Sequence, residues 1–167
     1  MPRQTDATTP RSRPLAVFTA AIIAYIGYNV IATLAGIIAR LPDVTTTHAT
    51  TDQVPLGQVI FPDGTIISPP LIFMVLAALL LWGVISNRKA LGAACASLLI
   101  LGAALTSIAE VTGLGNRPSL FSPAKWHVAV VAGSIYGVIG LAVVITGVAF
   151  LYHALAERRR LTSPDRA

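Results

Sequence analysis

The sequence predicts an all-α membrane protein: a bundle of four transmembrane helices, with both chain termini in the cytoplasm and a short β-hairpin in the first outer loop. Three observations predict this fold. Only 11% of the 167 residues are charged, less than half of the roughly 25% that is usual in soluble domains. Basic residues are distributed unevenly between the alternate connecting segments. Four stretches contain no Asp, Glu, Lys or Arg, and each is long enough to cross a bilayer as a helix, which takes about 20 apolar residues. These stretches are residues 14–39, 64–87, 90–109 and 126–156.

The distribution of basic residues determines the predicted orientation. Nine of the twelve Lys and Arg residues fall in the N-terminal tail, the central turn and the C-terminal tail; these are Arg3, Arg11, Arg13, Arg88, Lys89, Arg158, Arg159, Arg160 and Arg166. The other alternate segments contain Arg40, Arg117 and Lys125. Because cytoplasmic loops are enriched in Lys and Arg, we expect both termini in the cytoplasm and a multi-pass protein of the inner or plasma membrane. The net charge of +5 does not indicate nucleic-acid binding, since no aromatic residues are interleaved with the charges.

The predicted segments follow in order along the chain. Polar residues, prolines and arginines make residues 1–13 a disordered cytoplasmic tail. A transmembrane domain covers residues 14–156, and residues 157–167 form a second cytoplasmic tail. The turn between the second and third helices is so short that these two helices must run antiparallel. The four spans lie at about 14–40, 70–86, 90–112 and 126–156.

An outer loop is predicted at residues 41–69. Its second half has β-branched and aromatic runs at 58–61 and 65–67, on either side of Pro62-Asp63-Gly64. Proline presets φ at a turn, aspartate binds the local backbone, and glycine accepts a positive φ. We therefore expect a short β-hairpin, which lies against the helix ends or a partner because a lone hairpin is marginally stable in water.

Small residues lie on one face of the fourth predicted helix. Gly133, Gly137, Gly140 and Gly147 follow at spacings of four, three and seven residues. Glycine lets two helix backbones approach closely, which is how helices associate in lipid. Two uses remain open: packing against the third helix, which we favour, and homodimerisation.

A polar stripe lies along the first predicted helix; its polar members are Tyr25, Asn29, Thr33 and Arg40, with Gly36 between the last two. Polar groups inside a span are costly unless they face other helices or water. We favour hydrogen bonds between helices over a second interpretation, in which the stripe lines a cavity for a small ligand such as a quinone headgroup. Asn29 lies near mid-membrane and needs a partner; the candidates on the third and fourth helices are Ser97, Thr106, Ser134, Tyr136 and Thr146.

Glu110 is the only acid in or beside a predicted span. It lies about 30 Å along the third helix, at the outer end. We favour an interfacial ion pair or hydrogen bond with Arg40, Arg117, Lys125 or His127. In the alternative, Glu110, Arg40 and His127 form an outer polar cluster that recognises a ligand or partner.

No catalytic, cofactor-binding or metal-binding motif is present in the sequence. Cys95 is the only cysteine, so an internal disulfide is excluded. We expect a non-enzymatic structural or accessory subunit, without cofactor or metal, that packs in the lipid bilayer into a larger complex or a homo-oligomer through its fourth helix and outer hairpin. The alternative is a small transporter or ligand-binding membrane protein that uses the outer polar cluster and the polar stripe.

Overall fold

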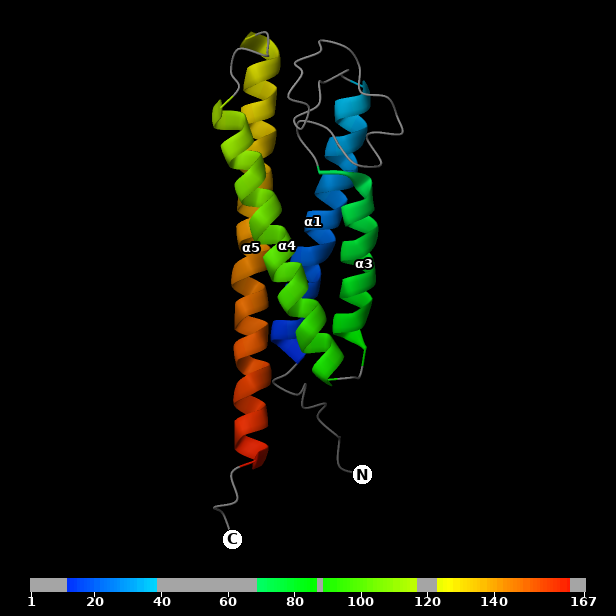
Figure 1. Ribbon diagram of the computed structural model, residues 1–167, viewed down its shortest axis with the longest axis vertical. Helices are drawn as coiled ribbons and strands as arrows, with labels where there is room; N and C mark the ends of the chain where they lie inside the picture. Colours follow the sequence, from blue (N-terminus) through cyan, green and yellow to red (C-terminus); the bar gives the residue numbers. More distant parts are fainter. Residues whose placement is uncertain (1–11, 39–68, 87–88, 117–122, 163–167) are drawn as a thin grey trace, which may run out of the picture.

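The computed structural model describes residues 12–38, 69–86, 89–116 and 123–162, and the regular elements in these ranges are all α-helices. The helices run alternately up and down, so the start of the first and the end of the last lie at the same end of the bundle (Figure 1). Within these ranges the predicted all-α architecture with four helices is confirmed, whereas the predicted β-hairpin lies outside the described residues. The helices are α1 (Ser12–Ile38), α3 (Leu71–Ile85), α4 (Lys89–Asn116) and α5 (Pro123–Thr162).

Three of the helices are long and apolar enough to cross a membrane. Their apolar segments are Arg13–Ile38, Ala90–Ala109 and Val130–Glu157. α3 is also apolar but has 15 residues, which gives a length of about 22 Å at 1.5 Å per residue. Large apolar side chains on all four helices are exposed, such as Ile38 on α1 and Trp82 on α3. These features fit a membrane protein, because such a surface suits lipid and not water.

Helices α4 and α5 are longer than the sequence predicts. The predicted third helix ends before Gly113, but a glycine costs only about 1 kcal/mol relative to alanine inside a helix, and α4 continues to Asn116. Pro123 takes the first position of α5, where proline is well tolerated. At its other end α5 continues to Thr162, since Ala, Leu, Glu and Arg in the last turns are strong helix formers.

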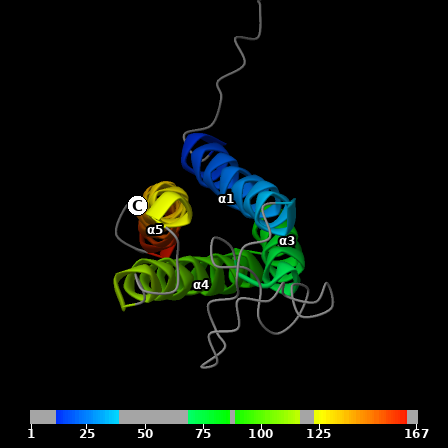
Figure 2. The same ribbon diagram turned by 90° about the horizontal axis from the view of Figure 1, so that it is seen from above.

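The four helices form a closed ring in the order α1, α3, α4, α5 (Figure 2). One face of α1 and one face of α5 turn toward the interior, because buried residues recur every three or four positions on both helices. From α1 the buried side chains include Phe18, Ile22, Tyr25, Asn29, Ala32 and Thr33. From α5 they include Tyr136, Val143 and Phe150, with buried glycines between them.

Glycines of α5 allow the close approach of two neighbouring helices. Gly133, Gly140 and Gly147 are buried, and Gly137 is half-buried. A Cβ on Gly147 would lie 2.5 Å from Cγ1 of Ile100 on α4 and 2.8 Å from the ring of Phe18 on α1. A Cβ on Gly140 would overlap the side chain of Ser107 on α4. Gly140 and Gly147 therefore serve packing inside the bundle.

Candidate functional site

Three hydroxyl groups from three helices meet inside the bundle. The Tyr25 hydroxyl of α1 lies 2.6 Å from the Tyr136 hydroxyl of α5 and 2.7 Å from the Thr106 hydroxyl of α4. Both tyrosines are buried, and their ring centroids are 5.5 Å apart. We call Tyr25, Thr106 and Tyr136 the hydroxyl cluster. It joins α1, α4 and α5 at one point.

The hydrogens of the hydroxyl cluster can be assigned from its neighbours. Thr106 Oγ1 lies 2.8 Å from the carbonyl oxygen of Gly102, one turn earlier in α4. A carbonyl only accepts and a hydroxyl has one hydrogen, so we assign the Thr106 hydrogen to this carbonyl, in the pattern common for threonine in helices. Tyr25 then donates to Thr106, and Tyr136 donates to Tyr25. Thr106 retains acceptor capacity but has no hydrogen left to donate.

Further polar groups pack around the cluster. The hydroxyl of Tyr28 donates to the carbonyl of Ala132 on α5 at 2.5 Å, and its ring centroid lies 6.1 Å from that of Tyr136. Nδ2 of Asn29 donates to the carbonyl of Tyr25 at 2.7 Å. The polar groups near the middle of α1 are thus hydrogen-bonded inside the bundle, as buried polar groups require.

The structure brings together three of the four residues of the predicted polar stripe. Tyr25, Asn29 and Thr33 share the buried face of α1, and Asn29 and Thr33 are 0% and 1% exposed. Thr106 and Tyr136, two of the hydroxyls expected near Asn29, bind Tyr25. The sequence prediction therefore identified the correct face of the helix but gave the central role to Asn29 and not to Tyr25. Arg40 lies outside the described residues.

The predicted outer cluster is only partly described. Glu110 lies near the end of α4 and His127 near the start of α5, and these two helix ends lie at the same end of the bundle (Figure 1). His127 is exposed, whereas the side chain of Glu110 is not among those described. Across residues 12–38, 69–86, 89–116 and 123–162, no three His, Cys, Asp or Glu side chains gather as a metal site would need.

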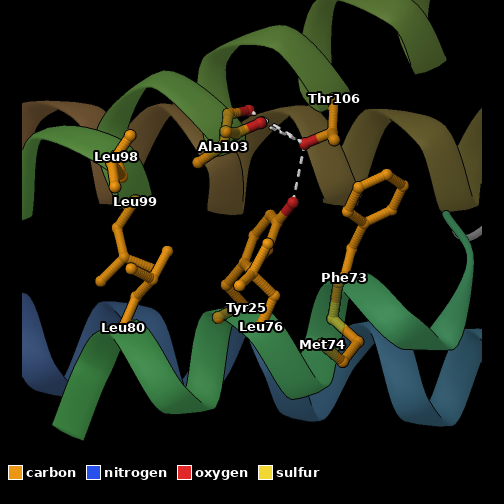
Figure 3. A pocket seen from close by; sticks show the side chains of 11 residues that line it. Tyr25, Phe73, Met74, Leu76, Leu80, Leu98, Leu99, Ala103 and Thr106 are labelled. Atoms are coloured by element: carbon orange, nitrogen blue, oxygen red, sulfur yellow. Dashed lines mark hydrogen bonds between the residues drawn. The ribbon is translucent and has the colours of Figure 1, made fainter. Parts of the chain in front are cut away.

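A cavity of about 90 Å³ lies beside the hydroxyl cluster, between α1, α3 and α4 (Figure 3). Tyr25 reaches between α3 and α4, and its hydroxyl points toward Thr106. The other walls are apolar and include Met74, Ala77 and Leu99. The sequence analysis missed this cavity, because the uniform apolar pattern of α3 does not show which side faces the bundle. The available signal was the pair of small residues, Ala77 and Gly102, on two helices that must be antiparallel.

A larger hollow of about 500 Å³ lies between α4 and α5, and we call it the α4–α5 groove. Small residues form much of its surface. The Oγ of Ser107 is buried there with no hydrogen-bond partner among the described residues. The residues that line the groove are Ala104, Ser107, Ile108, Thr112, Gly137, Gly140, Leu141 and Val144.

The chemistry available in the hydroxyl cluster is hydrogen bonding. Its members are two phenols and an alcohol, each of which can donate one hydrogen bond and accept others. The arrangement can hold helices together or bind an uncharged polar group. Comparison with protein-family models, with curated proteins and with solved structures finds no match for this chain.

Proposed function

We propose that this protein is a non-enzymatic membrane subunit that packs against other membrane helices, in a larger complex or in a homo-oligomer. The observation that carries this proposal is the α4–α5 groove, where glycine and alanine leave a hollow on the surface of the bundle. Helices in lipid associate through small residues, which permit close backbone contact. The groove is therefore a suitable binding site for a further helix.

The chemistry of the groove supports a helix as its occupant. Leu141 at the groove is 58% exposed, and Ile108 on the other wall is also exposed. An incoming helix would bury these side chains and form dispersion contacts with them.

The burial of the polar stripe favours packing over transport. Asn29 and Thr33 are inside the bundle, and Tyr25 binds side chains of two other helices. A transport path would need polar groups that face water or a substrate. The stripe instead supports the use of these residues as hydrogen bonds between helices.

We further propose that the end of the bundle at which α1 begins is cytoplasmic, in the inner or plasma membrane. Arg13 near the start of α1 and Arg159 near the end of α5 are both exposed, and α4 begins at Lys89. These three positions lie at one end of the bundle (Figure 1). The concentration of basic residues at one end supports this orientation.

Purification of the tagged protein from native membranes in mild detergent tests the packing function. We expect a stoichiometric partner or a stable homo-oligomer with the unmodified chain. Gly137→Leu should fill the groove and abolish the association, and Leu141→Ala should weaken it without touching the buried interior. Gly27→Leu is the matched control, because a Cβ at Gly27 meets nothing within 4 Å. A monodisperse monomer, or an association that survives Gly137→Leu, would contradict the proposal.

A further inference from the structure

The cavity beside the hydroxyl cluster has room for only a few heavy atoms. Its volume is about 90 Å³, smaller than an engineered apolar cavity of about 150 Å³ that binds benzene. Met74, Ala77 and Leu99 make most of its surface apolar. The size and lining fit the end of a slender apolar molecule and not a ring system.

The cavity is reached from the apolar surface of the bundle. Phe73 and Leu76 of α3 and Leu98 of α4 line it and are exposed, and Figure 3 shows them on the facing sides of these two helices. Gly102 of α4 also lines the cavity, and a Cβ there would meet nothing within 4 Å. A molecule dissolved among lipid chains can therefore place one end inside and leave the rest between α3 and α4.

The polar side of the cavity is formed by Tyr25 and Thr106. With the Thr106 hydrogen on the Gly102 carbonyl and the Tyr25 hydrogen on Thr106, the oxygen of Thr106 can accept but not donate. A ligand that gains a hydrogen bond here must bring its own hydrogen. A ketone or ester brings none, and a charged group would be uncompensated at this depth.

We propose that this cavity binds the hydroxyl end of a lipophilic alcohol. The hydroxyl donates its hydrogen to Thr106 Oγ1, and the apolar chain extends outward between α3 and α4. An alcohol hydroxyl among lipid chains has few acceptors, and an unmet hydroxyl is costly in an apolar medium. Tyr25 lies at the middle of the apolar segment Arg13–Ile38, so the cavity supplies an acceptor at a depth where lipid chains supply none. This binding site is separate from the α4–α5 groove and does not depend on the packing function.

Photolabelling tests this inference with two defined probes: 1-octanol carrying a diazirine near its hydroxyl, and the methyl ether of the same compound. The protein is held in lipid nanodiscs, irradiated with each probe, and digested for mass spectrometry. We expect the alcohol to label residues such as Met74 and Leu99, competed by excess 1-octanol. The ether has no hydrogen to donate and should label these residues several-fold less. Equal labelling by both probes would overturn the proposal.

Three variants make the test specific for the cavity. Gly102→Leu places a side chain in the cavity and should abolish labelling there, whereas Gly27→Leu, an equal change outside the cavity, should leave it intact. Thr106→Val removes the acceptor and keeps the shape, so the alcohol should label no better than the ether. Circular dichroism reports folding, and Thr106→Val decides the question if Gly102→Leu does not fold. Labelling that survives Gly102→Leu, or a preference for the alcohol over the ether that survives Thr106→Val, would refute the site.

Discussion

The hydroxyl oxygens of Tyr25 and Tyr136 lie 2.6 Å apart inside the bundle, where they join the first helix of the chain to the last. Thr106 extends this contact to α4. Three of the four described helices are thus held at one buried point. Ring packing adds a second contact between α1 and α5, since Phe18 and Phe150 stack with centroids 5.6 Å apart nearer the end where α1 begins. Aromatic side chains therefore join α1 and α5 at two levels of the bundle.

Removing the hydroxyl of Tyr25 should weaken the bundle without emptying its core. Tyr25→Phe keeps the ring but loses the bonds to Thr106 and Tyr136, and we expect a loss of about 1 kcal/mol in the free energy of unfolding, as is typical for such bonds in membranes. The measurement is reversible unfolding in mixed micelles. Tyr152→Phe, at a residue that is 70% exposed, is the control with no expected change. In a double-mutant cycle, Tyr25→Phe and Tyr136→Phe should be non-additive; additive effects would mean that the two hydroxyls do not interact.

Adding one methyl group should have opposite effects at two glycines. Gly147→Ala forces a Cβ against Ile100 and Phe18, and overpacking of this kind costs about 1–3 kcal/mol. Gly102→Ala meets no atom within 4 Å, so the better helix propensity of alanine should stabilise the protein by up to about 1 kcal/mol. Thermal denaturation in detergent measures both. Equal melting temperatures for the two variants would contradict the close contact of Gly147 with Ile100 and Phe18.

Reactivity of Cys95 should report the contact between α3 and α4. This thiol is buried, and a Cβ on Gly83 of α3 would overlap its sulfur. We expect slow maleimide labelling in the folded protein and fast labelling after denaturation. Gly83→Val should push the helices apart and accelerate labelling, whereas Gly27→Val should not. Fast labelling of the unmodified folded protein would place Cys95 elsewhere.

Reporter fusions should reveal the orientation of the chain. A reporter that is active only in the cytoplasm should work at residue 88 and at the C-terminus, and fail at residue 50. The reason is the excess of Lys and Arg in the segments that flank residue 88 and the C-terminus. A reporter active only outside the cytoplasm supplies the reciprocal control. An exported C-terminus would reverse the assignment.

The gaps between charged residues were sufficient to locate all four helices, because long uncharged apolar stretches have few alternatives to a helix in lipid. The ends of the helices were harder to predict, since Gly113 was expected to follow the end of the third helix, whereas α4 continues through it. The polar stripe identified the buried face of α1. The contacts of the stripe with other helices depend on how α1, α4 and α5 are rotated about their axes, which the distribution of charges does not specify. For this reason only the structure shows that Tyr25 is the residue that binds the hydroxyls of α4 and α5.

The helices differ greatly in apolar length around one bundle. α3 measures about 22 Å and the apolar segment Val130–Glu157 of α5 about 42 Å, at 1.5 Å per residue, whereas the hydrocarbon core of a bilayer is about 30 Å thick. A flat membrane cannot match both helices. A helix as short as α3 is matched by thinner lipid, by flanking side chains that reach to the interface or by association with another helix, and one as long as α5 by tilt or thicker lipid. In a bilayer the bundle would therefore meet the hydrocarbon core with an apolar surface of unequal height, lowest on the flank of α3.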